Sequence, residues 1–318
     1  MGARLKTFWA IGRKSGRVAW IVGAFLSAQP ATAQVPAQRE RLALTLLTFN
    51  LCATCDKRDE RLDLIAREIQ RLDPDIVALQ EVMTWPWNFL KKIRETIPYE
   101  YSYYKTAPKG ISGLAILSRY PLTRQKNHPL PGKTGWILSH GLLNSTVNSP
   151  LGPIEVYTTQ LIPNHMENPK RDSQWATVAE KIGENPSLNP QILMGDLNAR
   201  EEGRLQRSIK ADWIDTFRTA NPDAAAEPGY TWDREKNRNI SASEWPDWPS
   251  VRIDYIYVIA SNEGETDVKV LESRLVLKQP DPKGAFPSDH FGVLSKIEIS
   301  RPEIIALLLS RFFRPRGF

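Results

Sequence analysis

The sequence predicts an α/β fold in which two β-sheets pack against each other and helices cover their outer faces. Short apolar runs of the kind that form buried strands recur between residues 42 and 300, whereas few stretches show the spacing of an amphipathic helix. Strands and helices do not alternate one for one, so a doubly wound parallel sheet is not expected. Many strands with few helices between them bury their apolar faces by packing sheet on sheet.

The expected elements begin with a strand at residues 42–49, which ends on Asn50. A helix follows whose apolar residues fall on one face and which ends before Pro74, the face being Leu62, Ile65, Ile69 and Leu72. A strand at 76–82 then carries Glu81 near its end. Further strands are expected at 114–117, 154–161, 192–194, 252–259 and 291–299, with a helix around Trp175, Val178, Ala179 and Ile182.

The first 33 residues predict a secretory signal peptide. Five basic residues precede an apolar run from Ala19 to Ala28, and the small residues 31–33 follow it. The alternative is a single membrane anchor, which needs roughly 20 apolar residues, and this run is shorter. We therefore expect cleavage near Ala33 and an exported protein, either periplasmic or secreted.

The remainder of the chain divides into three parts. Residues 34–41 are expected to be a linker, 42–300 a single domain, and 301–318 a basic and apolar tail. The tail is too short to span a bilayer. Two explanations of it stay open: it lies on an anionic membrane surface, or it docks on the domain as a final helix. No protein partner is predicted.

The formal net charge of +6 comes from the two ends of the chain. The signal segment carries five basic and no acidic residues, and the tail carries four Arg and one Glu, so residues 34–300 retain about −2. A protein that grips many backbone phosphates would carry a general basic excess, so the charge counts mildly against a nuclease.

Cys52 and Cys55 are the two cysteines of the chain. One pair cannot complete a four-ligand zinc site. A redox-active pair is expected at a strand-to-helix junction of a thioredoxin-like unit, and the other motifs do not predict such a unit. The remaining explanations are a small structural disulfide or two unrelated thiols near the rim of a site.

Several expected strands begin or end on polar side chains that a packed core would exclude. Burying such groups without partners costs about 1–3 kcal/mol each, so several of them on one rim indicate a site. Carboxylate and amide oxygens suit Mg²⁺ or Mn²⁺, and an imidazole transfers protons near neutral pH. Singly, each residue also has an ordinary explanation as a turn or a solvated strand end. The set is Asn50, Glu81, Gln160, Asp196, Asn198, Asp254, Asp289 and His290.

The segments that carry these residues resemble motifs of the endonuclease/exonuclease/phosphatase superfamily, both in their amino-acid sequences and in their order along the chain. The match is specific because several separate motifs recur over nearly the whole expected domain. The resembling segments are Leu47–Asn50, Asp75–Val82, Gly113–Arg119, Met194–Asn198, Arg252–Ile256 and Ser288–Phe291.

The resemblance implies a four-layered α/β sandwich, in which two packed mixed β-sheets are flanked by helices and the site lies at one edge of the sheets. It also implies a bound divalent metal, Mg²⁺ or alternatively Mn²⁺. Glu81 would hold this metal chiefly, with Asn50 and Asp289 nearby.

The resemblance further implies catalytic roles. Residues that match Asp196 and Asn198 position the attacking water and phosphate oxygens, and His290 acts as a base or a phosphate stabiliser beside Asp254. The expected reaction is in-line attack of water on phosphorus without a covalent enzyme intermediate.

One position departs from the family's pattern. Strand 154–161 resembles the strand that carries a second catalytic histidine in the deoxyribonuclease and sphingomyelinase branches, and Gln160 stands there. An amide donates a hydrogen bond to phosphate but cannot deliver a proton to a leaving group. His165 either substitutes from the following loop or is a surface histidine.

Aromatic residues are frequent around the expected site. They can stack on bases, sit at a membrane interface or cover edges of the core. The loop sequences Gly229–Asp233 and Phe286–Phe291 resemble those of sphingomyelinase-type and uncharacterised bacterial branches, which favours a phosphodiesterase for lipid headgroups or another small diester. The alternatives are an exported nuclease for DNA or RNA and a binding module without catalysis. The aromatic segments are Trp85–Trp87, Trp136, Tyr230–Trp232 and Trp245–Trp248.

Overall fold

The computed structural model describes residues 39–97, 99–106, 111–132, 141–163, 168–184, 189–209, 211–240, 248–260 and 266–303. The expected signal peptide, Trp136, His165, Trp245 and the tail after Glu303 lie outside these residues. No helix in the described part of the chain is both long enough and apolar enough to cross a membrane.

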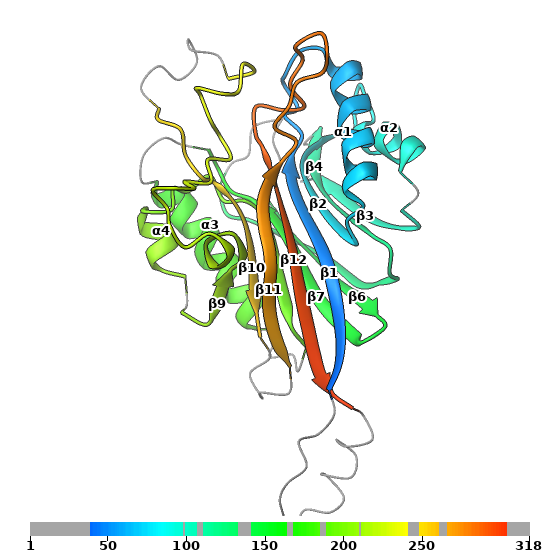
Figure 1. Ribbon diagram of the computed structural model, residues 1–318, viewed down its shortest axis with the longest axis vertical. Helices are drawn as coiled ribbons and strands as arrows, with labels where there is room; N and C mark the ends of the chain where they lie inside the picture. The colour runs from blue at the N-terminus through cyan, green and yellow to red at the C-terminus, as the bar shows by residue number, and fades with distance from the viewer. Residues whose placement is uncertain are drawn as a thin grey trace, which may run out of the picture. The chain divides into compact units, whose positions relative to one another are not determined.

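Six strands of the described chain form the first sheet, in the order β11-β12-β1-β2-β4-β3 (Figure 1). Strands β1 and β2 run parallel, and the other neighbours are antiparallel. The sheet is therefore mixed, as predicted. Its strands are β1 (Arg39–Asn50), β2 (Ile76–Met83), β3 (Tyr101–Thr106), β4 (Ser112–Ser118), β11 (Asp267–Val276) and β12 (Gly292–Pro302).

The second sheet repeats this plan with six further described strands, in the order β5-β6-β7-β8-β10-β9. Here β7 and β8 form the parallel pair, and their neighbours are antiparallel. The strands are β5 (Leu122–Pro129), β6 (Gly141–Ser149), β7 (Gly152–Gln160), β8 (Gln191–Asp196), β9 (Trp213–Asp215) and β10 (Asp254–Ile259).

The alternation of side chains along β1 divides the core into layers. Leu44 and Leu46 face the second sheet, where they join Val156 and Ile256 in one buried cluster. Leu47 and Phe49 face the other way. They pack beneath α1 (Arg58–Leu72) and α2 (Phe89–Thr96), which cover the first sheet.

The outer face of the second sheet is covered in the same way. Trp175 and Val178 of α3 (Pro169–Gly183) pack on Tyr157 and Leu193 of β7 and β8. Leu205 of the short helix α4 (Arg204–Arg207) joins this cluster, whereas α5 (Thr216–Ala220) places Phe217 in the core between the two sheets. Helix, sheet, sheet and helix make the predicted four-layered sandwich, and Figure 1 shows α1 and α3 on opposite sides of the strands.

Two predicted boundaries need correction. Strand β1 begins at Arg39, inside the expected linker 34–41, and β12 ends at Pro302, inside the expected tail 301–318. The two corrections have one cause, because residues 39–41 pair with residues 300–302 and extend the antiparallel ladder at both ends of the domain. Strands β3, β5, β6, β9 and β11, together with α2, α4 and α5, were not predicted from the sequence.

Candidate active site

One edge of the two sheets collects the polar residues predicted to form the site. The parallel strands β1 and β2 end there, with Asn50 at the end of β1 and Glu81 near the end of β2. The parallel strands β7 and β8 end there too, with Gln160 and Asp196 as cross-strand partners. Strand β10 begins opposite Asp196, and β12 begins just after His290. The topology therefore brings together residues spread over 240 positions of sequence, from Asn50 to His290.

Asn50 connects the two sheets at this edge. Its amide nitrogen donates to Glu81 Oε1 at 3.2 Å and to Asp196 Oδ2 at 3.1 Å. Its amide oxygen accepts from the backbone N–H of Cys52 at 2.9 Å, which fixes which end of the amide faces the carboxylates. A carboxylate from each sheet is thus held to one side chain.

Glu81 projects from an irregular point of β2. Its backbone has a φ of 55°, and the pairing of β2 with β4 shifts register between Leu79 and Val82. Glu81 Oε1 accepts from the Gln160 amide at 2.8 Å, and Oε2 accepts from the Ala53 N–H at 2.8 Å. Gln160, which the sequence resemblance predicts to stand in place of a second histidine, therefore orients the predicted metal ligand.

Asp196 and Asn198 form a compact turn after β8. The Asp196 carboxylate accepts from the Asn198 backbone N–H at 2.8 Å and from its side-chain amide at 3.0 Å. The same amide donates to Leu161 O at 2.9 Å. Burial of Asp196, together with the negative charge of Asp254, raises the pKa of Asp196 to about 7.

Asp254 and His290 form a buried pair. The distance from Asp254 Oδ2 to His290 Nδ1 is 2.9 Å. Thr231 Oγ1 accepts from the Asp254 N–H, and Ser288 Oγ accepts from the His290 N–H, both at 3.1 Å. Burial lowers the pKa of His290, but the charges of Asp254 and Asp289 outweigh it, so the pKa lies well above its ordinary value. These carboxylates therefore favour the protonated form of the imidazole.

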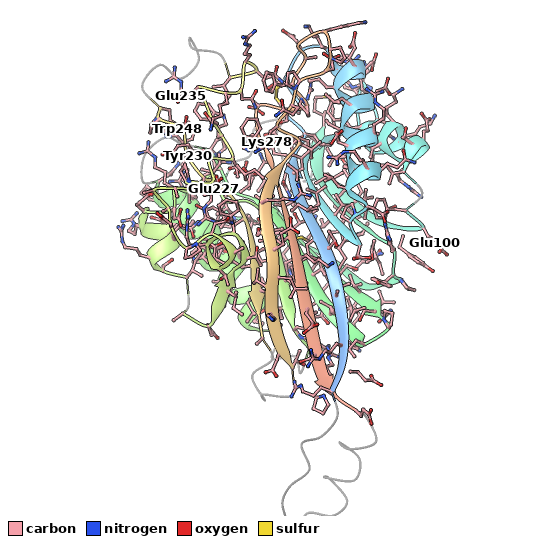
Figure 2. All side chains as sticks on the ribbon, viewed as in Figure 1. Glu100, Glu227, Tyr230, Glu235, Trp248 and Lys278 are labelled. Atoms are coloured by element: carbon pink, nitrogen blue, oxygen red, sulfur yellow. A yellow bond between two sulfur atoms is a disulfide. The ribbon has the colours of Figure 1, made fainter. Side chains whose placement is uncertain are left out.

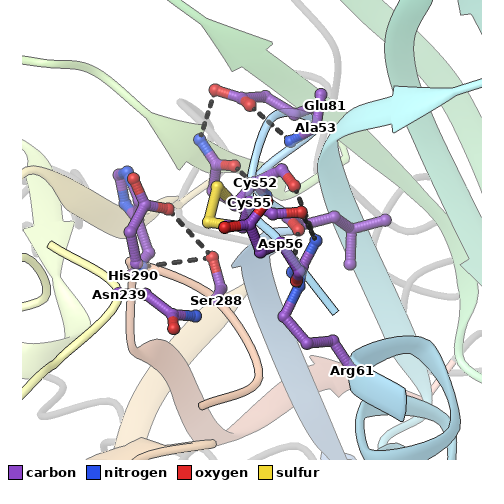
Figure 3. The surroundings of a disulfide bond; sticks show 12 residues. Cys52, Ala53, Cys55, Asp56, Arg61, Glu81, Asn239, Ser288 and His290 are labelled. Atoms are coloured by element: carbon purple, nitrogen blue, oxygen red, sulfur yellow. Dashed lines mark hydrogen bonds between the residues drawn. A yellow bond between two sulfur atoms is a disulfide. The ribbon is translucent and has the colours of Figure 1, made fainter. Parts of the chain in front are cut away.

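Cys52 and Cys55 form a disulfide with a Cα separation of 5.5 Å, and it lies at the rim of the site among Glu81, His290 and Arg61 (Figure 3). The predicted structural disulfide is thus the correct explanation of the pair. One oxygen of Asp289 lies within 4.8 Å of both sulfurs, and this carboxylate accepts from the Ser288 hydroxyl at 3.1 Å. Bonded sulfurs are not thiolate ligands, so this group is no metal site.

Arg61 of α1 holds the loops around the disulfide, and its role was not predicted. The side chain is 1% exposed. Its five N–H groups reach the carbonyl oxygens of Leu51, Cys52, Cys55, Asp56 and Pro287. Burial lowers the pKa of Arg61 to about 10 despite the negative charges of Asp289 and Glu81.

Three roles were therefore missed in the sequence, those of Arg61, Thr231 and Ser288. A signal for Arg61 existed, because it lies four residues before Ile65 on the buried face of α1. Thr231 lies in the aromatic segment Tyr230–Trp232, and Ser288 lies in the resembling segment Ser288–Phe291. Their partners, however, are backbone N–H groups that a sequence pattern does not reveal.

The donors at this edge fit a hard divalent cation. Single atoms of Asp196, Asp254 and His290 lie within 4.8 Å of one another, and Glu81 is linked to Asp196 through Asn50. Asp254 Oδ1 is buried and has no hydrogen-bond partner among the described residues. Carboxylate and amide oxygens are the ligands that Mg²⁺, Mn²⁺ and Ca²⁺ prefer. Glu81 would hold the ion with Asn50 nearby, because the Asn50 amide turns its nitrogen toward the carboxylates and its oxygen toward the Cys52 N–H. The acidic surroundings would complement the charge of the ion.

Comparison with protein families identifies this arrangement. The model of the Endonuclease/Exonuclease/phosphatase family matches residues 47–290, a range that includes all eight predicted site residues. The chain belongs to this family. It is accordingly a divalent-metal-dependent hydrolase of phosphate esters, which confirms the enzyme class predicted from the sequence.

Individual relatives and solved structures are similar to this chain over most of its length. Tyrosyl-DNA phosphodiesterase 2 of Xenopus tropicalis is 27% identical over 273 residues, covering 82% of this chain and 68% of the relative. Inositol phosphosphingolipids phospholipase C of Schizosaccharomyces pombe is 23% identical over 301 residues, covering 80% of this chain and 68% of the relative. The crystal structure of D. rerio TDP2 complexed with single strand DNA product shares the fold, with a TM-score of 0.68 and 20% identity over 80% of this chain and 98% of that chain.

The described aromatic residues near the site divide into two groups. Trp232 and Trp248 are buried with ring centroids 5.1 Å apart, and they cover an edge of the core beside Val251. Trp85 and Trp87 are instead 67% and 44% exposed. Trp232 and Trp248 therefore cover an edge of the core, whereas Trp85 and Trp87 are free to contact a ligand or a membrane surface.

Proposed function

We propose that the chain is an exported, Mg²⁺-dependent phosphodiesterase, with Glu81 as the main metal ligand and Asn50 and Asp289 nearby. The observation that carries the proposal is the Asn50 amide, which links Glu81 of the first sheet to Asp196 of the second. Next to this link lies the buried pair of Asp254 and His290. A phosphate at this edge would contact groups from both sheets.

The side chains have distinct roles in the proposed reaction. His290 Nδ1 faces Asp254, which leaves Nε2 of the protonated ring to donate to a phosphate oxygen. Asp196, with a pKa of about 7, accepts the proton of the attacking water, and Asn198 holds Asp196 in place. A divalent ion held by Glu81 would supply Lewis-acid stabilisation of the charge that develops on the phosphoryl oxygens. Water attacks in line with the ester oxygen that departs.

The substrate is proposed to be a diester. One relative carries the name phosphodiesterase and another the name phospholipase C, and both names describe enzymes that act on diesters. A lipid headgroup or another small diester is preferred over DNA or RNA, because residues 34–300 carry about −2 rather than a basic excess. A nuclease is the second candidate, favoured by the likeness to a tyrosyl-DNA phosphodiesterase.

Export is part of the proposal. It is supported by the basic and apolar N-terminal segment and by the Cys52–Cys55 disulfide, since disulfides persist in oxidising compartments. The test is the mass of the mature protein, with an N-terminus near Gln34 expected. Contact of residues 301–318 with a membrane surface is a separate proposal, which co-sedimentation with anionic vesicles tests on chains with and without residues 304–318.

The deciding experiment for the activity is hydrolysis of bis(p-nitrophenyl) phosphate with Mg²⁺, Mn²⁺ or EDTA. We expect the release of p-nitrophenol to depend on the metal and to fall by about 10²-fold or more in Glu81→Gln. Glu100→Gln is the matched control, because Glu100 lies away from this edge of the sheets (Figure 2). Hydrolysis that persists unchanged in EDTA and in Glu81→Gln would refute the metal site.

A further inference from the structure

We propose that a groove beside Glu81 binds an aromatic ring carried by the phosphate ester, with Trp85, Trp87 and Arg58 as the stacking groups. This inference rests on the proposed function and specifies part of its substrate. The groove has a volume of about 650 Å³ and is lined by Ala53–Glu60, Met83, Trp85–Trp87 and Ile111. We call it the tryptophan groove. Its size is that of a small-molecule site.

The tryptophan groove adjoins the proposed metal ligand directly. Ala53 lines the groove, and its N–H donates to Glu81 Oε2 at 2.8 Å. One residue therefore borders both the ring site and the carboxylate. A phosphate beside Glu81 would place an attached group at the entrance of the groove.

Both walls of the groove are fixed by hydrogen bonds. On one wall, the N–H and hydroxyl of Thr84 donate to Ile111 O at 2.8 and 3.1 Å, and Asn88 caps α2 just beyond Trp87. On the other, Arg61 donates to Cys55 O and Asp56 O beside the disulfide. A groove formed in advance loses little freedom when a ligand binds.

The exposed groups of the groove suit a flat ring. Trp85 and Trp87 are the most exposed tryptophans of the described chain, and the Arg58 guanidinium carbon lies 3.5 Å from the centroid of the Trp87 ring. Indole and guanidinium faces both stack on aromatic ligands, and each stacked base contributes about 1–3 kcal/mol to single-strand binding in other proteins.

The charges of the groove argue against a membrane as its occupant. Three exposed carboxylates, Asp56, Asp59 and Glu60, line the groove and outnumber its two basic residues, Lys57 and Arg58. An anionic bilayer surface attracts basic clusters and is repelled by such carboxylates. A neutral ring attached to a phosphate that binds elsewhere does not meet this repulsion.

The test measures binding to the Mg²⁺-loaded protein by calorimetry, with methylphosphonate, cyclohexylphosphonate and phenylphosphonate as ligands. In each of these compounds a single organic group is joined to phosphorus by a P–C bond, which water does not cleave. We expect phenylphosphonate to bind about tenfold more tightly than methylphosphonate, with cyclohexylphosphonate closer to the methyl compound. Trp85→Ala and Trp87→Ala should remove the phenyl preference and leave methylphosphonate binding unchanged.

Tyr230→Ala is the matched control for loss of an exposed ring. Tyr230 is 38% exposed and lines a different groove of about 480 Å³ with Glu227 and Lys278, all labelled in Figure 2. The phenyl preference should survive this change. Equal binding of the phenyl and cyclohexyl compounds, or a preference that persists in both tryptophan variants, would overturn the proposal.

Two sources of the ring are separated by further ligands. If phenyl phosphate binds more tightly than methylphosphonate and Trp87→Ala removes the difference, the ring belongs to an aryl ester. If adenosine 5′-monophosphate binds more tightly than ribose 5-phosphate, the ring belongs to a nucleotide. Vesicle binding that Trp85→Ala abolishes would assign the tryptophans to a membrane instead and overturn the inference. Metal-dependent diester hydrolysis without any ring preference refutes the inference alone, whereas no hydrolysis of any diester refutes the proposed function as well.

Discussion

At the scale of single residues, the two oxygens of Asp254 have different surroundings. Oδ2 faces His290 Nδ1 at 2.9 Å, and Oδ1 is buried without a hydrogen-bond partner among the described residues. The negative charge of this carboxylate is one reason that the pKa of His290 is raised. The charge, rather than the shape of the side chain, therefore favours the protonated imidazole.

Asp254→Asn removes this charge and nearly preserves the shape. We expect the pKa of His290 to fall, so that fewer molecules carry the imidazolium at neutral pH, and turnover to drop by about 10²–10⁴-fold. NMR titration of the His290 ring and the rate of bis(p-nitrophenyl) phosphate hydrolysis measure the two effects. Asp223→Asn in a surface turn is the control. An unchanged His290 pKa would contradict the assignment.

Gln160 suggests a gain of function. Its amide donates to Glu81 at 2.8 Å but has no proton to give to a departing alkoxide. Gln160→His should raise the hydrolysis of alkyl diesters, by up to about 10²-fold, because general-acid catalysis matters most for poor leaving groups. The rate for p-nitrophenyl esters should change much less. Equal effects on both classes of ester would show that position 160 acts only through Glu81.

The residues that form the site could be predicted from the sequence, whereas the hydrogen bonds and contacts among them could not. All eight predicted residues lie at the same edge of the sheets, because each follows or precedes a strand that a strong apolar run had revealed. The contacts of Asp289 were not predicted, nor were those of Arg61 and Thr231. Their partners are the disulfide or backbone atoms of distant loops, and a sequence pattern carries no information about these.

At the scale of elements, α1 supports the site through a single side chain. Arg61 joins the loop after β1 to the loop before β12, and all its partners are carbonyl oxygens. A lysine has three donors where arginine has five, so at least two buried carbonyls would lose their partner.

We therefore expect Arg61→Lys to lower the free energy of unfolding by about 2 kcal/mol or more. Arg71→Lys on the same helix is the control, because its ion pair with Glu68 is exposed and should contribute less than about 0.5 kcal/mol. Urea unfolding of both variants provides the comparison. Similar losses in the two variants would mean that the buried contacts of Arg61 contribute little.

The disulfide segment supports the metal ligands in a second way. The N–H of Cys52 orients Asn50, and the N–H of Ala53 orients Glu81. We expect the double change Cys52→Ser and Cys55→Ser to weaken metal binding by about 10–100-fold, the usual effect of losing such support. Calorimetric titration with Mn²⁺ measures this. Ser145→Ala, within β6, controls for the loss of a buried polar side chain.

The elements that escaped prediction share a physical reason. Strand β11 lies at an edge of its sheet, and β5 lies at an edge of the other, so both present polar side chains to solvent. Strand β6 is buried but carries Asn144 and Thr146, which hydrogen-bond Glu155 of β7. Polar groups that satisfy one another inside a fold remove the apolar pattern on which prediction depends.

At the scale of the whole molecule, one core joins the two sheets. Met194 lies in this core, fully buried, two residues before Asp196. We expect Met194→Ala to lower the free energy of unfolding by about 2–5 kcal/mol, because the cavity lies between the sheets. Leu271→Ala, 43% exposed on β11, should cost less than about 0.5 kcal/mol. Urea denaturation distinguishes the two, and equal losses would contradict a shared inter-sheet core.

Because Asn50 links the two sheets, a ligand that binds at this site also stabilises the folded protein. An ion or phosphate that touches groups of both sheets binds the native chain and not the unfolded one. By thermodynamic linkage, such a ligand at 100 times its Kd adds about 2.7 kcal/mol to stability. The melting temperature of the protein, followed against ligand concentration, then serves as a binding isotherm, and it ranks metals and phosphate compounds without any need for turnover.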